Sequence, residues 1–191
     1  MKRLLKIVGI CIVVCGLGLG GTLFFSNANR GEFITQESGI HFRTIKFGFI
    51  EVFGEFRKFH AQGIVQNGKV VELKGTIEAA SVDSKNEARD EKIRAQELLN
   101  VAQNPVISFE MIEFAPSQNS DDKDSDDIGT GTIVGNLTLN GITKQVVLKS
   151  HIKPENALSL RTRINVKDFG MPNFPVVSDE VEISANIALE E

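Results

Sequence analysis

Side chains that could act as nucleophiles or metal ligands are sparse and scattered along this 191-residue chain. Its three histidines, His41, His60 and His151, lie far apart, and none has a cysteine or carboxylate at the spacing typical of a metal site. Both cysteines, Cys11 and Cys15, fall in an apolar N-terminal run, so the remainder has no thiol nucleophile. A G-x-S-x-G motif is also absent from the sequence. We therefore predict no enzymatic activity, no metal site and no required cofactor.

An acidic tract at residues 120–127 is the other candidate for chemistry. Its carboxylates suggest Ca²⁺ binding, but an EF-hand loop starting at Asp122 would need glutamate at the position of Ile133. The tract also lacks glycine at the sharp turn of such a loop. We expect a solvated loop between two strands.

Charge excludes one further class of protein, and aromatic content argues against another. The net charge is −4, and the three cations of the N-terminal segment leave about −7 (−4 minus 3) on the rest, with no basic stripe for nucleic acid. The chain has 13 phenylalanines but no tryptophan or tyrosine, so it lacks the aromatic girdles of outer-membrane barrels. Phenylalanine has no polar group, which favours a dry interior.

The N-terminal residues 1–28 have the pattern of a targeting segment. Positive residues precede the uncharged stretch Ile7–Phe25, and Ser26 and Ala28 occupy the −3 and −1 positions that a signal peptidase accepts. The stretch is also long enough to span a bilayer, so cleavage after Ala28 and retention as a membrane anchor both fit. Either outcome predicts a domain outside the cytoplasm: periplasmic, secreted or tethered to the inner membrane. A linker at 29–37 and one domain at 38–191 would follow.

Within that domain, apolar residues recur at every second position, the period of a strand with one buried face. Asn140-Gly141 is a hairpin-turn signal, and residues 86–94 have a helical pattern. Together these features predict an all-β fold, an eight-stranded antiparallel barrel or sandwich with one short helix that could lie across a barrel mouth. The eight predicted strands lie at residues 40–47, 52–64, 71–79, 107–111, 133–139, 146–152, 158–164 and 181–189.

An ordered set of short motifs resembles the YceI-like family of bacterial polyisoprenoid-binding proteins. The segments that carry this resemblance are 38–42 (SGIHF), 52–59 (VFGEFRKF), 80–84 with 89–90 (ASVDS and RD), 104–109 (NPVISF), 135–144 (GNLTLNGITK), 165–171 (NVKDFGM) and 177–181 (VSDEV). The resemblance implies an eight-stranded lipocalin-like barrel that holds one long-chain amphiphile, such as a polyprenyl diphosphate or a quinone. An eight-stranded barrel has room for one small ligand.

Residues for the lipid tail are drawn from motif phenylalanines and from the apolar faces of the strands. The predicted tail lining is Phe42, Phe56, Phe59, Leu73, Ile77, Ile107, Phe109, Met111, Leu137, Leu148, Leu160 and Phe169. The family often has histidine where this chain has Lys46 and Lys92, so these lysines, with Arg89, are the candidates for contact with an anionic head group.

Two questions stay open from the sequence. A barrel whose interior is fully packed would instead be a stress-response or protein-interaction module without a lipid. The sequence also leaves open which lipid is bound and whether the chain forms a homodimer.

Overall fold

The computed structural model describes residues 33–117, 129–153 and 157–189. They form one antiparallel sheet with a short helix, α1 (Glu87–Arg94), and two 3₁₀ turns, η1 (Ala79–Ser81) and η2 (Val166–Phe169). The ten strands are β1 (Phe33–Lys46), β2 (Ile50–Phe56), β3 (Phe59–Gln66), β4 (Lys69–Glu78), β5 (Val82–Asp83), β6 (Val106–Pro116), β7 (Gly129–Leu139), β8 (Ile142–Lys153), β9 (Ala157–Asn165) and β10 (Glu180–Leu189).

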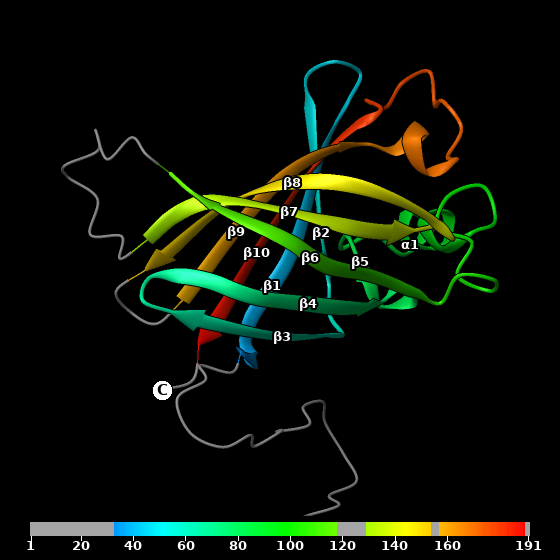
Figure 1. Cartoon of the computed structure of the whole chain (residues 1–191). Helices are drawn as coiled ribbons and strands as arrows, with labels where there is room; N and C mark the ends of the chain where they lie inside the picture. The colour runs from blue at the N-terminus through cyan, green and yellow to red at the C-terminus, as the bar shows by residue number, and fades with distance from the viewer. Residues whose placement is uncertain (1–32, 118–128, 154–156, 190–191) are drawn as a thin grey trace, which may run out of the picture.

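The sheet curls into a partial barrel (Figure 1). Its strand order is β3-β4-β6-β7-β8-β9-β10-β1-β2-β5, so β3 and β5 are the two edges. The segment Glu78–Asp83 joins these edges at one end. There Glu78 N–H donates to the Lys58 carbonyl (3.0 Å), and Arg57 N–H donates to the Ser81 carbonyl (3.1 Å). The gap between the two edge strands is therefore bridged at this end of the barrel by the chain that leads from β4 to β5.

The predicted count of eight strands is wrong, because the described part of the chain already forms ten. The phenylalanine-rich segment 52–64 contains two strands, β2 and β3, which separate at Arg57 and Lys58. The other strand that was not predicted, β5, has two residues and pairs with Glu55 and Phe56 of β2. A strand of that length leaves no visible period in the sequence.

The helix and the Asn140-Gly141 hairpin turn are confirmed. Asn86 caps α1 by accepting a hydrogen bond from Arg89 N–H (3.0 Å), which satisfies a donor that the first turn would otherwise leave free. Glu87 lies in the first turn and Lys92 in the last, the arrangement that the helix dipole favours.

The start of β1 lies inside the predicted linker at 29–37. Phe33 pairs with Leu189 of β10, and an irregularity in register follows between Ile34 and Gly39. The proposed targeting segment and the acidic tract at 120–127 both lie outside the described residues. Among the helices that the structure does describe, none is long and apolar enough to cross a membrane.

Three hairpin turns share a pair of residues with positive φ, the second of which is glycine. Two are Asn67-Gly68 (φ 52° and 70°) and Asn140-Gly141 (φ 52° and 73°), the composition that such turns favour. The third joins β1 to β2 and has Phe47-Gly48 (φ 55° and 78°).

Candidate functional site

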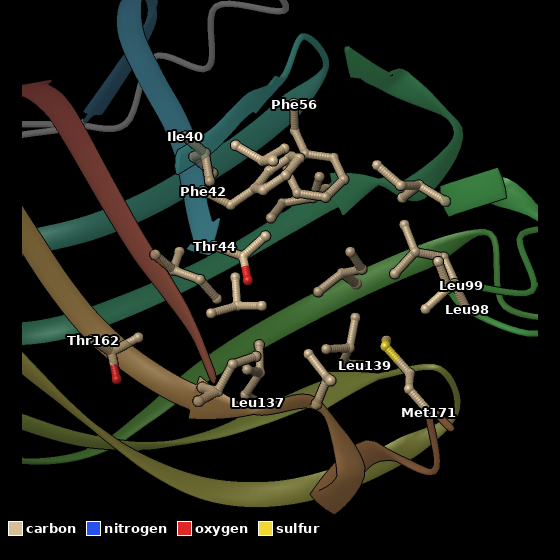
Figure 2. A pocket seen from close by; sticks show the side chains of 18 of the residues that line it. Ile40, Phe42, Thr44, Phe56, Leu98, Leu99, Leu137, Leu139, Thr162 and Met171 are labelled. Carbon is tan, nitrogen blue, oxygen red and sulfur yellow. The ribbon is translucent and has the colours of Figure 1, made fainter. Parts of the chain in front are cut away.

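A cavity of about 860 Å³ occupies the interior of the barrel. Alternate residues of the strands point into it, such as Phe42 and Thr44 on β1, and Leu137 and Leu139 on β7 (Figure 2). The same alternation on β10 contributes Val181, Ile183, Ala185 and Ile187. Because the period of a strand is two, the apolar face of each strand becomes the wall of the cavity.

Two glycines allow phenylalanine rings to lie against this wall. Gly54 pairs with Phe42 across β1 and β2, and a Cβ atom at Gly54 would lie 2.5 Å from Cε1 of the Phe42 ring. Gly135 makes the same room for Phe109, whose Cε2 would lie 2.6 Å from a Cβ. Phe42 also packs on Phe56, with ring centroids 5.8 Å apart (Figure 2). The glycines therefore keep space free along the middle of the barrel.

Helix α1 and the turn that follows it form one boundary of the cavity, with Ile93, Leu98 and Leu99 among the lining residues. A buried carboxylate holds this helix to β5. Asp90, only 3% exposed, accepts hydrogen bonds from the backbone N–H and the hydroxyl of Ser84. Arg89 donates to the Ser84 hydroxyl oxygen (2.7 Å) and carbonyl (2.6 Å). These bonds fix the position of α1 over the interior.

The cavity opens to solvent where exposed residues join its lining. Apart from Lys74 on β4, these belong to two segments at one end of the barrel (Figure 1). One segment is α1 with its N-cap Asn86 and the turn after it, which contributes Ala88 and Lys92; the other is the loop at residues 172–176. We call the opening between them the mouth.

The structure brings nine of the twelve predicted tail residues into the cavity lining: Phe42, Phe56, Leu73, Ile77, Ile107, Phe109, Leu137, Leu148 and Leu160. The other three lie outside that lining. Phe169 is 1% exposed and packs in the core beside Met171, while Met111 packs on a second core cluster around Ile133. Phe59 is half-buried and is not part of the lining, although its cross-strand partner Ile77 and its neighbour His60 are.

All three predicted head-group residues line the cavity, but their surroundings differ. Lys92 is exposed on α1 at the mouth. Lys46 ends β1, with Nζ 5.0 Å from the centroid of the Phe47 ring. The guanidinium of Arg89 donates hydrogen bonds to the hydroxyl and the carbonyl of Ser84.

Several lining residues were not predicted. Thr44, Thr162 and the inward residues of β10 follow the period of two and could have been chosen by extending that pattern. The loop at residues 172–176 has no periodic signal, and only its tertiary position brings it to the cavity.

Ion pairs shift side-chain pKa values on the outer side of the β2–β5 junction and in a second cluster around Arg43. Lys85 Nζ lies 2.9 Å from Glu55 and 3.0 Å from Asp83. The hydrogen bond from Lys85 lowers the pKa of Glu55, and the backbone N–H and ammonium of Lys85 lower that of Asp83. Among the described residues, no three His, Cys, Asp or Glu side chains gather closely enough to hold a metal ion.

Comparisons with known proteins agree on one family. The family model of the YceI-like domain matches residues 32–189. A UPF0312 protein of Pseudomonas aeruginosa is 28% identical, in an alignment that covers 91% of this chain and 95% of that protein. A UPF0312 protein of Shewanella denitrificans is 29% identical, with 90% and 91% covered.

Solved structures show the same fold. BcnA of Burkholderia cenocepacia superposes with a TM-score of 0.69 at 18% identity, over 81% of this chain and 97% of that one. A polyisoprenoid-binding domain from Saccharophagus degradans, implicated in plant cell wall breakdown, gives a TM-score of 0.58 at 14% identity, over 85% and 99%.

Proposed function

The chain belongs to the YceI-like domain family, and from this premise we propose that it binds and carries a long-chain, isoprenoid-type lipid without catalysing a reaction. The observation that carries the proposal is the apolar cavity of about 860 Å³ inside the barrel. A cavity of this size lies within the range of small-molecule sites, which are mostly apolar with a few polar groups.

The energetics of the cavity favour a ligand. The cavity opens to solvent at the mouth, so water occupies it when no ligand is bound, and an apolar tail would displace that water from an apolar wall. A tail that buries a dozen methylenes would contribute about 10 kcal/mol before the cost of association. The same argument disfavours the alternative of a fully packed interaction module, since the interior is not packed.

The polyisoprenoid-binding domain of Saccharophagus degradans supports this class of ligand, although its similarity to the chain extends to the fold alone. The chemistry of the wall supports it independently. Branched isoprenoid tails need an apolar channel without buried polar groups to desolvate, and Phe42, Phe109 and Leu137 supply such a surface.

For the head group we propose an anionic moiety such as a diphosphate, held by Lys46 and Lys92. Replacing both with glutamine should weaken the binding of geranylgeranyl diphosphate about two- to tenfold, the range expected of charges screened by solvent, and leave the binding of geranylgeraniol unchanged. Lys144 and Lys149, exposed on β8 and outside the cavity lining, give the matched control pair. Equal loss for both ligands, or none for either, would contradict the assignment.

We also propose that the protein works in the bacterial cell envelope, in the periplasm or tethered to the inner membrane. The support is the N-terminal sequence, in which cations precede 19 uncharged residues. N-terminal sequencing of the protein recovered from cells would separate the two forms, since cleavage gives a chain that begins at Asn29. Recovery of all the protein in the cytoplasm would refute the proposal.

Lipid carriage itself can be tested by native mass spectrometry. Residues 29–191 would be produced in a bacterial periplasm, purified without detergent, and sprayed from a volatile buffer. We expect a stoichiometric adduct of long-chain mass that lipid extraction then identifies. A bare protein that also fails to take up added geranylgeraniol would refute the proposal.

A further inference from the structure

An apolar lip stands beside the mouth of the cavity. It consists of Ile45, Phe47, Phe49 and Ile50 at the β1–β2 turn, with Phe174 and Val176 from the neighbouring loop. All six are exposed, Phe47 by 52% and Phe49 by 78%. Single exposed apolar residues are ordinary, whereas a contiguous group of them marks an interaction site.

The two parts of the lip are bonded to each other. Phe47 N–H donates to the Val176 carbonyl (2.7 Å), and Ser178 N–H donates to the Ile45 carbonyl (2.8 Å). Phe174 and Val176 also line the cavity. The lip therefore continues into the cavity lining, which gives an apolar path from the surface to the interior. In Figure 1 the hairpin projects beyond the curled sheet, next to this loop.

The turn residue Phe47 is costly for the fold. The two other turns of this kind have asparagine before glycine, at φ of 52°, whereas this one holds a phenylalanine at φ 55°. Positive φ is unfavourable for a bulky side chain, and within the fold the ring gains partial burial and a contact with Lys46 Nζ in return. Asparagine would suit the turn itself better, so the half-exposed ring favours a role in binding.

The charge of the lip points to its partner. Between residues 45–50 and 170–178 the only charged side chain is Lys46, although the whole chain has a net charge of −4. Carboxylates border these ranges, but Glu51 pairs with Arg43 and Asp179 pairs with Lys167. Apolar side chains with a neighbouring cation match the interface of an anionic bilayer, where rings enter the boundary of the acyl chains and cations meet the head groups.

We propose that the lip inserts into the head-group region of an anionic lipid bilayer and sets the mouth of the cavity against the membrane surface. Its use as an entry route for a lipid tail rests on the proposed function, whereas the docking itself does not. Phe47 and Phe49 enter the bilayer, Lys46 lies among the phosphates, and Phe174 and Val176 connect the membrane to the cavity.

The absence of tryptophan from the chain allows a specific test. In the full-length protein, Phe49→Trp places a single fluorophore at the tip of the lip. Val147→Trp is the matched control, because Val147 is 54% exposed on β8, three strands away from β1 in the sheet. Each variant would be mixed with vesicles of phosphatidylethanolamine and phosphatidylglycerol, with and without brominated acyl chains.

We expect the emission of Phe49→Trp to move to shorter wavelength on the vesicles and to be quenched by bromine, while Val147→Trp remains in water. Because each reporter senses its own site, membrane contact through the N-terminal segment does not affect the comparison. Adding Phe47→Asn to Phe49→Trp should weaken the response about tenfold, since one ring is lost.

Three results would overturn the docking. They are an unchanged emission from Phe49→Trp, an equal response from both reporters, and a shift in Phe49→Trp that grows with protein concentration without vesicles. The last would assign the lip to a second copy of the chain. Native mass spectra of the same samples keep the proposed function separate. A lipid-loaded protein with a water-exposed lip refutes docking alone, whereas an empty protein with a docked lip refutes lipid carriage alone.

Discussion

Gly54→Ala is predicted to obstruct the cavity while sparing the fold. A methyl group at this position would lie 2.5 Å from Cε1 and 3.0 Å from Cε2 of Phe42, with Cζ closer still. Normal carbon–carbon contacts are about 3.5–4.0 Å, so the ring must move by about 1 Å or more. The wall is behind the new methyl group, and the free space is in the cavity. We therefore expect the ring to swing inward.

The inward shift of the Phe42 ring occupies cavity space that one or two methylene groups of the ligand would otherwise fill. At about 0.8 kcal/mol for each methylene, binding weakens by about 0.8–1.6 kcal/mol, or four- to fifteenfold in Kd. The cost to folding should stay below the 1–3 kcal/mol that overpacking of a tight core usually brings, because the ring has somewhere to go.

Equilibrium dialysis with radiolabelled geranylgeraniol measures the binding, and urea unfolding measures the stability. Gly75→Ala is the control, since Gly75 also lines the cavity but a Cβ there meets only the His60 carbonyl at 3.7 Å. It should leave both quantities nearly unchanged. Gly54→Ala/Phe42→Leu should recover binding. Unchanged affinity in Gly54→Ala, together with a stability loss above about 3 kcal/mol, would refute this account of the wall.

Three further predictions concern the frame around the cavity. Asp90→Ala should lower the free energy of unfolding by about 2 kcal/mol in urea, because the Ser84 N–H and hydroxyl lose their buried acceptor, whereas Glu91→Ala should have little effect. Phe47→Asn should raise the free energy of unfolding by about 1 kcal/mol, because asparagine tolerates the positive φ better, whereas Phe49→Asn should not. An equal gain in both would show that the loss of an exposed apolar side chain, not the turn conformation, is the cause. Folding lowers the pKa of Glu55 and Asp83, so their stabilisation is present above the ordinary carboxyl pKa of about 4 and is lost as pH falls through the lowered values. Urea midpoints at about pH 3 and pH 6 should therefore differ less in Lys85→Gln than in the unsubstituted protein, and an equal difference would contradict the pairing.

The regular part of this fold was predictable because a strand with one buried face has apolar residues at every second position. Long strands such as β7 and β10 were located from alternation alone, and Asn140-Gly141 identified its own turn. The same alternation assigned Phe42, Phe109 and Leu137 to the interior. Each of these inferences depends on local pattern, which survives without knowledge of the tertiary structure.

Features that depend on distant contacts were not predictable in this way. Strand β5 has two residues, and it forms because the chain after β4 crosses to the opposite edge of the sheet and pairs there with β2. Phe169 lies in the motif at residues 165–171 and was predicted to line the cavity, but the turn η2 buries it in the core. The loop at residues 172–176 reaches the cavity only because its backbone bonds to the β1–β2 hairpin. Sequence pattern indicates which face of an element is apolar, but not whether that face meets core, cavity or membrane.

The most direct test of the central claim is a crystal structure of the protein with geranylgeraniol bound. The account predicts continuous density for the isoprenoid chain inside the barrel, in contact with Phe42, Phe109 and Leu137 and with its polar end at the mouth near Lys46 and Lys92. A barrel interior that contains only ordered water, with the isoprenoid absent or bound on the outer surface, would contradict it.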